Sequence, residues 1–223
     1  MKALIFGATG MVGQGVLRES LLAADVEQVV VVGRTAVETT DPKLQSLVVP
    51  DLTRLGAVET QLQGFDACFF CLGVSSSGMD EAQYSRLTYD LTLAVAEGLA
   101  RLNPNMTFVY VSGAGTDSSE KGKSMWARVK GRTENALQRL PFKAVYLFRP
   151  GVIQPLNGAV SKTSAYRWTY IVMGPLLPLL RRLFPRHVLT TVSVGQAMLG
   201  VVRKGYTTAV MEAADIQAAA LRG

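Results

Sequence analysis

Residues 2–13 read KALIFGATGMVG, a short apolar run followed at once by glycines at positions 7, 10 and 13. So short an apolar run, ended by glycine, predicts a buried β-strand. The residues after it, 11–24, place apolar side chains at helical spacing. Strand, glycine-rich turn and helix in this order are the context in which spaced glycines bind a dinucleotide. The stretch therefore predicts the opening of a Rossmann-type fold.

Each glycine of this turn has its own predicted role. Gly7 permits the tight turn, Gly10 lets the backbone approach a pyrophosphate, and Gly13 lets the helix pack close to the strand. Free backbone N–H groups at the start of the helix bind the phosphates. The remaining contacts of the loop are expected from Thr9, Met11 and Val12.

The second predicted strand, residues 28–33, ends before Arg34 and Thr35. A carboxylate at this place binds the ribose hydroxyls of NAD, whereas an arginine suits the 2′-phosphate of NADP. Because Arg34 lies about twenty residues beyond the glycine turn, the sequence predicts NADP(H) as the cofactor in preference to NAD(H). The alternative is an ordinary solvated surface arginine.

Further apolar runs alternate with helical patterns along the chain. Strands are predicted at residues 44–49, 66–73, 106–113 and 143–151, and helices at residues 81–102 and 124–140. Apolar strands separated by helices indicate a parallel sheet covered on both faces. The predicted fold class is therefore α/β, a Rossmann-type doubly wound parallel sheet with a small C-terminal cap.

The cap is predicted because the pattern changes after Pro150. Residues 193–205 and 215–222 have helical patterns, with a short predicted strand at 208–212 between them. The sequence shows no clear linker that would separate these elements from the sheet. We expect one NAD(P)-binding domain, residues 1–223, in which residues 152–223 contribute a small cap on the substrate side.

Two further strand ends carry candidate cofactor contacts. Asp51 follows the third strand, where it can accept the adenine amino group with Leu52 beside it, or cap a helix. Leu72, Gly73 and Val74 follow the fourth strand and are expected to line the adenine and ribose side of the groove. Open α/β sheets bind ligands at the carboxyl ends of their strands.

Composition narrows the function classes. The chain has 223 residues, of which 48% are hydrophobic and 18% charged, enough apolar material for a sizeable core. The net charge of +6 favours anionic partners in general. No nucleic-acid-binding module is recognisable, so no specific nucleic acid is expected as a partner.

Cysteine usage and hydropathy give two more expectations. Cys68 and Cys71 form a C-x-x-C pair, but a structural zinc site needs about four ligands, and the chain has no other cysteine and one histidine. We therefore predict two small buried residues and no metal site. The longest uncharged stretch, residues 168–180, is too short to cross a bilayer, so a cytoplasmic protein without a transmembrane segment is expected.

The ordered motifs together resemble the short-chain dehydrogenase/reductase superfamily. Within it, the chain is similar to the atypical branch near the NmrA-like and Tat-interacting-protein-like NAD(P)H-binding oxidoreductases. The matching stretches are GATGMVG (7–13), GR (33–34), DL (51–52), CLG (71–73), VYVSGAG (109–115), VKGRTE (129–134), FRPGVI (148–153) and TTVSVGQAML (190–199). The resemblance covers nearly the whole chain.

The resemblance implies a Ser–Tyr–Lys catalytic constellation. Ser112 matches the serine that hydrogen-bonds the substrate carbonyl, and Lys130 matches the lysine that holds the nicotinamide ribose. The tyrosine position is occupied by Trp126, whose indole donates a hydrogen bond but is not a proton acid. The stretch beside the nicotinamide is matched by Pro150, Gly151 and Val152.

Two functions are compatible with this departure. The first is an NADP(H)-dependent oxidoreductase of a small or apolar carbonyl or alcohol compound, in which Trp126 donates a hydrogen bond and another group supplies the proton. Candidate proton donors are Tyr84, Tyr89, Tyr166 and Tyr170. The second is a noncatalytic NADP(H)-sensing regulator or scaffold that acts through a protein partner, as the NmrA-like proteins do. A third interpretation places Trp126 simply in the core.

Residues 166–187 mix large apolar side chains with four arginines. The segment suits a lid over the substrate, a peripheral membrane contact, or ordinary core with a basic edge. A homodimer is also an open expectation, because superfamily members often pair through helices.

Overall fold

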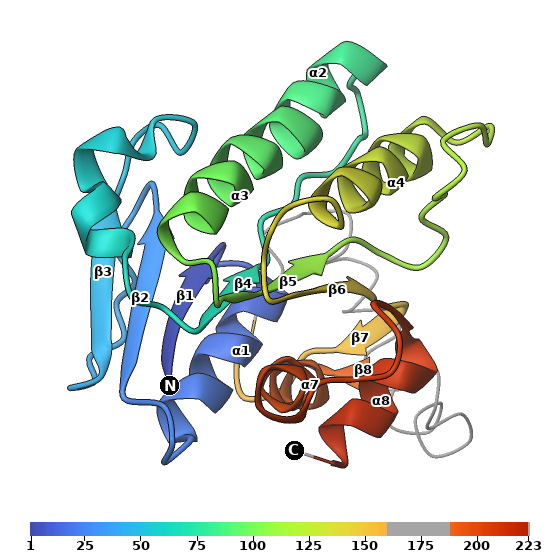
Figure 1. Ribbon diagram of the computed structural model, residues 1–223. Helices are drawn as coiled ribbons and strands as arrows, with labels where there is room; N and C mark the ends of the chain where they lie inside the picture. The colour runs from blue at the N-terminus through green and yellow to red at the C-terminus, as the bar shows by residue number, and fades with distance from the viewer. Residues whose placement is uncertain (160–187, 223) are drawn as a thin grey trace.

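The computed structural model describes residues 1–159 and 188–222 and shows a parallel sheet between two helical layers (Figure 1). Within these residues, seven strands pair in the order β3-β2-β1-β4-β5-β6-β9, and every pairing is parallel. The order reverses between β1 and β4, as in doubly wound sheets whose ligands bind at such a switch point. The predicted Rossmann-type α/β fold is confirmed.

The predicted strands and helices are all present. The strands are β1 Lys2–Phe6, β2 Gln28–Gly33, β3 Leu44–Val48, β4 Ala67–Phe70, β5 Thr107–Val111, β6 Ala144–Arg149, β7 Val152–Gln154, β8 Val188–Thr190 and β9 Val210–Glu212. The α-helices are α1 Met11–Leu22, α2 Glu81–Ser85, α3 Leu91–Leu102, α4 Met125–Leu137, α7 Thr191–Lys204 and α8 Ala213–Ala220. A 3-10 helix, η1, spans Leu55–Leu62, and a π-helical turn, η2, spans Arg86–Asp90.

Two cores lie on opposite faces of the sheet. Successive side chains of a strand point to opposite faces, so Ile5 faces one core and Phe6 the other. The first core packs the sheet against α1, α7 and α8, and the second packs it against η1, α3 and α4. Figure 1 shows these two helical layers on either side of the strands.

Three features differ from the expected elements. The predicted helix 81–102 is divided by η2 into α2 and α3. The predicted strand 208–212 is β9, which pairs with β6 and extends the main sheet. The short strands β7 and β8, which the apolar pattern did not reveal, form a separate parallel pair.

The C-terminal elements join the body of the sheet through α7. This helix packs closely on α1 at Gly15. A Cβ on Gly15 would lie only 2.5 Å from the carbonyl oxygen of Thr191, so the contact requires glycine there. A cap built by residues 152–223 stays a prediction, and the candidate lid or membrane segment 166–187 lies outside the described residues. In the part of the chain that the structure describes, no helix is long and apolar enough to cross a bilayer.

Candidate functional site

The glycine turn between β1 and α1 has the geometry predicted for it. Gly7 has a φ of +80°, and a Cβ there would lie 2.8 Å from the backbone of Cys71. A Cβ on Gly13 would lie 2.1 Å from the carbonyl oxygen of Gly7, so helix and turn touch. At Gly10 a Cβ would lie 3.3 Å from the carbonyl oxygen of Gly7, a tight contact but no collision. The turn thus requires glycine at 7 and 13 for the fold, and at position 10 a Cβ would fit only tightly.

The carboxyl ends of four strands surround a pocket of about 480 Å³. Met11 comes from the turn after β1, Gly73 and Val74 follow β4, Ser112 follows β5, and Gly151 follows β6. Helices α2 and α4 complete it with Tyr84, Trp126 and Lys130. Its other lining residues are Ser75, Ser76, Gly113, Ala114, Pro150 and Ile153. The pocket brings together the three predicted catalytic residues and, of the predicted cofactor contacts, also Met11, Gly73, Val74, Pro150 and Gly151.

The remaining predicted cofactor contacts lie along the same edge of the sheet or beside it. Arg34 and Thr35 are exposed after β2. Asp51 is exposed after β3, and its carboxylate accepts hydrogen bonds from the backbone N–H (3.0 Å) and hydroxyl (2.6 Å) of Thr53, which lowers its pKa. It therefore shapes the turn before η1 and is not the residue that caps this helix, which begins after Arg54.

Four residues predicted to contact the cofactor already pack or hydrogen-bond within the protein. Leu52 is buried and Leu72 packs against the same core. The carbonyl of Thr9 accepts a hydrogen bond from Gln14, and Val12 packs on the α1 core. Val152 is exposed at the start of β7. The roles of these residues toward a cofactor stay predictions.

Lys130 is a buried cation at one wall of the pocket. Its ammonium donates a hydrogen bond to the carbonyl of Ser112 at 2.7 Å and lies 5.8 Å from the centre of the Tyr110 ring. Burial lowers its pKa to about 8, and the charge of Glu134 partly opposes this shift. A lysine with this pKa exchanges its proton near neutral pH, as acid–base groups in active sites do.

Ser112 and Trp126 both line the pocket, and the Ser112 hydroxyl is already hydrogen-bonded within the protein. The Ser112 hydroxyl lies 2.6 Å from a carboxylate oxygen of Glu134 and 3.1 Å from the carbonyl of Phe148. A hydroxyl has one proton to donate, so Ser112 uses it inside the protein and offers a substrate its acceptor lone pairs. Trp126 is half-buried, with its ring against the backbone of Gly115.

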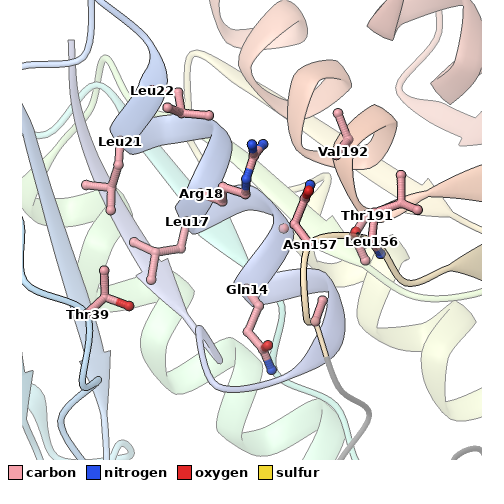
Figure 2. Close-up of a pocket in the computed structure, with 12 residues that line it drawn as sticks. Gln14, Leu17, Arg18, Leu21, Leu22, Thr39, Leu156, Asn157, Thr191 and Val192 are labelled. Atoms are coloured by element: carbon pink, nitrogen blue, oxygen red, sulfur yellow. Dashed lines mark hydrogen bonds between the residues drawn. The ribbon is translucent and has the colours of Figure 1, made fainter.

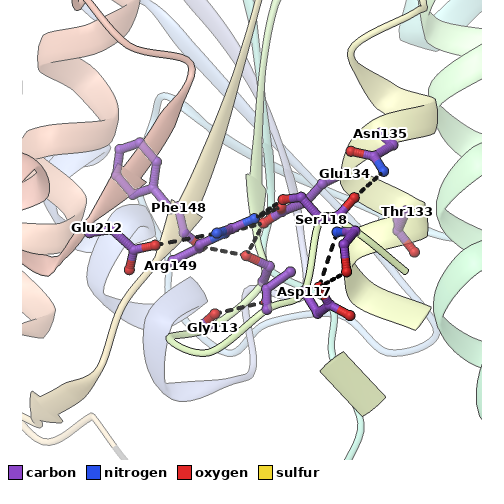
Figure 3. A network of polar contacts seen from close by, with 12 residues as sticks. Gly113, Asp117, Ser118, Thr133, Glu134, Asn135, Phe148, Arg149 and Glu212 are labelled. Carbon is purple, nitrogen blue, oxygen red and sulfur yellow. Dashed lines mark hydrogen bonds and ion pairs between the residues drawn. The ribbon is translucent and has the colours of Figure 1, made fainter. Parts of the chain in front are cut away.

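Beneath the pocket lies an ionic network that the sequence analysis did not identify. Figure 3 shows Arg149, at the end of β6, between Glu134 of α4 and Glu212 at the end of β9. Its guanidinium contacts both carboxylate oxygens of Glu134, whose side chain is 0% exposed. This contact raises the pKa of Arg149. Glu134 ends the motif VKGRTE and Arg149 lies in the motif FRPGVI, so both belong to stretches that resemble the family, and this could have marked them as site residues.

The two cysteines have no reactive surroundings. Cys68 is buried and Cys71 half-buried, and both are free thiols. Burial raises the pKa of both, that of Cys71 to about 12. A thiol with so high a pKa is inert as a nucleophile or redox group.

A second hollow, of about 380 Å³, runs along the outer side of α1 (Figure 2). Leu17, Arg18 and Leu21 line it from α1, Thr39 from the loop after β2, and Asn157 from the segment after β7. None of the predicted site residues lines this hollow, so the candidate site is the pocket at the strand ends.

Comparison with known proteins agrees with this location. Residues 7–150 match the model of a family described as NAD(P)H-binding, and this range contains the glycine turn, Lys130 and Pro150. Protein HTATIP2 of Rattus norvegicus is 29% identical over 151 residues, which cover 67% of this chain and 61% of that protein. The mitochondrial protein fmp52-2 of Aspergillus oryzae is 29% identical over 154 residues, 68% of this chain and 66% of that protein. The matches thus span less than two thirds of these relatives.

Solved structures share the fold at low sequence identity. The Bordetella bronchiseptica enzyme WbmF, in complex with NAD⁺, has a TM-score of 0.67 at 17% identity, over 97% of this chain and 76% of that chain. A short-chain dehydrogenase/reductase family oxidoreductase of Burkholderia thailandensis has a TM-score of 0.65 at 16% identity, over 98% and 92%. These matches confirm the predicted resemblance, and the family match over most of the chain shows that this protein belongs to the family described as NAD(P)H-binding.

Proposed function

We propose that this protein is an NADP(H)-dependent oxidoreductase that interconverts a small or apolar carbonyl compound and its alcohol. The observation that carries the proposal is the shared pocket, which joins Met11 of the glycine turn to Lys130 and Gly151. In this proposal the glycine turn and the N-terminus of α1 hold the pyrophosphate. When bound, the nicotinamide supplies or accepts the hydride.

The residues of the chain would bind and polarise the reactants. Lys130 keeps N–H donors beyond the one it gives to Ser112, enough to hold ribose hydroxyls. Its positive charge, in a buried setting, stabilises negative charge that develops on a carbonyl oxygen. The indole N–H of Trp126 is a further donor from the same helix.

The decisive test measures binding and turnover separately. Binding of NADPH is followed by its fluorescence, and its consumption by absorbance, with para-nitrobenzaldehyde, acetaldehyde and cyclohexanone as carbonyl probes. We expect consumption by wild type, and loss of both binding strength and turnover in Lys130→Met. Arg139→Ala, which changes an exposed residue after α4, is the control and should behave as wild type.

A noncatalytic NADP(H) sensor is the second candidate, favoured by Trp126 in the tyrosine position and by the engaged hydroxyl of Ser112. The same measurement separates the two. Tight NADPH binding without consumption of any probe favours the sensor, and a cofactor-dependent protein partner would then be sought. The cytoplasmic location stays a prediction, and the name of the fungal relative includes the word mitochondrial.

The preference for NADP(H) is proposed from Arg34. Arg34 is exposed directly after β2, and an arginine at this point of the sequence suits the 2′-phosphate of NADP. A hydrogen bond to a charged group contributes about 1.5–3 kcal/mol, so Arg34→Ala should weaken NADPH binding roughly 10- to 100-fold. NADH binding, which lacks the phosphate, should change little. Equal NADPH and NADH affinities in wild type would contradict the preference.

A further inference from the structure

A carbonyl that accepts a hydride must also gain a proton, and the predicted site residues leave its source open. The Ser112 hydroxyl is engaged with Glu134, and the indole of Trp126 is not an acid. Lys130 donates to the carbonyl of Ser112. A hydroxyl from another element that faces the same pocket would supply this proton and leave the Lys130 hydrogen bond to Ser112 in place.

Tyr84 of α2 is a described tyrosine that lines this pocket. It is 2% exposed, so its phenol lies inside the protein at the pocket wall. It also lies near Tyr110, whose pKa is raised by burial and, to a smaller extent, by Tyr84. The Lys130 ammonium approaches that same Tyr110 ring. Tyr84 and Lys130, which line the pocket, thus cluster around the buried ring of Tyr110.

The other candidate tyrosines are not in this cluster or cannot be placed. The ring of Tyr89 lies 4.0 Å from the guanidinium carbon of Arg132, and Tyr89 does not line the pocket. Tyr166 and Tyr170 lie outside the described residues. Among the candidates that the structure describes, Tyr84 is the one at the site.

Helix α2, which carries Tyr84, is held in place by contacts at its start and with α4. Asp80 and Gln83 form a reciprocal capping box at its start. Glu81 pairs with Arg128 of α4 at 2.6 Å, and Arg128 also donates to the carbonyl of Gly122. The π-helical turn η2 follows directly, and such turns often occur at functional sites. The helix is thus tied to α4, which carries Lys130.

We propose that Tyr84 is the catalytic proton donor in place of the tyrosine replaced by Trp126; this rests on the oxidoreductase function proposed above. The carbonyl carbon gains a C–H bond with hydride from NADPH, which is oxidised to NADP⁺. The carbonyl π electrons move to oxygen as this oxygen takes the proton from the Tyr84 O–H bond. Water returns a proton to the phenolate. In the reverse direction Tyr84 removes the proton of the alcohol.

The test compares Tyr84→Phe with Tyr89→Phe in the full-length protein. Losing a general acid costs about 100- to 10,000-fold in rate, so Tyr84→Phe should lower kcat for para-nitrobenzaldehyde by that factor. NADPH affinity should stay within about threefold of wild type, because the hydroxyl acts on the carbonyl. Tyr89→Phe keeps its ring under Arg132 and should retain wild-type kcat.

A second readout does not require turnover. Tyrosine labelled at the ring carbon that bears the hydroxyl is observed by NMR in the complex with NADP⁺, and para-nitrobenzaldehyde is then added. The resonance absent from Tyr84→Phe should shift, because its hydroxyl now donates to the aldehyde, while the resonance absent from Tyr89→Phe should not. An unmoved Tyr84 resonance in the presence of bound aldehyde overturns the proposal.

The outcomes distinguish a failure of the proposed role of Tyr84 from a failure of the proposed oxidoreductase function. An active wild type with an equally active Tyr84→Phe variant overturns the role of Tyr84 and leaves the oxidoreductase intact. A wild type that binds NADPH and consumes it with no probe overturns both. Should Tyr84→Phe not fold, fluorotyrosine incorporation replaces it: the more acidic phenol should move the alkaline limb of the kcat profile to lower pH, and an unmoved limb overturns the proposal.

Discussion

Lys130 is the single residue in which the physical chemistry of the site is clearest. Its side chain is buried beside the pocket, hydrogen-bonded to the Ser112 carbonyl, and close to the carboxylate of Glu134. Desolvation lowers its pKa to about 8, against the attraction of Glu134. The folded protein therefore binds this proton less tightly than the unfolded chain does, and stability must depend on pH.

The pH dependence has a definite sign. Between the folded pKa of about 8 and the ordinary lysine pKa of 10.5, the unfolded chain holds more protons than the folded one, so this group makes stability rise with pH. From about pH 7.5 to about pH 9.5 the gain is roughly 2 kcal/mol. Urea unfolding at these two pH values should show it in wild type and not in Lys130→Met. The same gain in stability in both proteins would show that a titrating group other than Lys130 causes it.

At the residue scale, the sequence predicted which side chains lie at the site better than it predicted their hydrogen-bond partners. Ser112, Trp126 and Lys130 were all placed at the pocket, as the structure finds. The hydroxyl of Ser112 is nevertheless engaged by Glu134, twenty-two positions along the chain. Spacing along a helix or strand shows which residues share a face, but not which charge of another element turns toward them.

At the scale of elements, Arg149 and Glu134 join β6, α4 and β9. The Glu134 side chain is fully buried and that of Arg149 is 11% exposed, whereas Glu212, the second partner of Arg149, is 53% exposed, so the charge of Arg149 depends mainly on Glu134. Removing one member of a buried pair leaves a charge without compensation and costs about 3–5 kcal/mol. Glu134→Gln should lower the free energy of unfolding by that amount.

The matched control is the surface pair of Glu59 and Arg101, in which the side chains are 36% and 66% exposed. Exposed pairs contribute about 0–1 kcal/mol, so Glu59→Gln should have little effect. Urea unfolding of both variants measures the difference. Similar losses in the two would show that the Glu134 network is not a stabilising junction of these elements.

The loop 113–123, which contributes to the pocket, rests on α4 at Gly131. A Cβ on Gly131 would lie 1.8 Å from the carbonyl oxygen of Asp117, so Gly131→Ala must push the loop away. Overpacking of this kind costs about 1–3 kcal/mol. Gly98→Ala, in helix α3 with no atom within 4 Å of the new Cβ, should instead stabilise by about 0.5–1 kcal/mol. Thermal unfolding checks the opposite signs; equal shifts would contradict the contact.

The strands of the main sheet could be predicted, because each of them is a short apolar run that ends in a turn. How the elements touch could not. The close contact of α1 and α7 depends on Gly15 and Gly195, which are far apart in the chain and read singly as weak helix positions. The π-helical turn in 81–102 and the pair β7 and β8 are also set by tertiary packing, which local periodicity does not record.

At the scale of the whole molecule, cofactor binding and folding are linked. A ligand that binds only the folded state, at about 100 times its Kd, adds roughly 2.7 kcal/mol of stability. For a chain of this size that raises Tm by about 5–10 °C. We expect this shift with NADPH in wild type, measured by calorimetry.

Gly10 and Gly13 separate the two uses of the glycine turn. A Cβ on Gly13 would collide with the Gly7 carbonyl at 2.1 Å, so Gly13→Ala should lower Tm even without cofactor. A Cβ on Gly10 meets no atom closer than 3.3 Å and lies where the pyrophosphate is expected. Gly10→Ala should therefore lower the Tm of the free protein much less than Gly13→Ala does, and lose most of the shift with NADPH. A full NADPH shift in Gly10→Ala would place the phosphates away from this turn, and the fold would then bind its cofactor elsewhere.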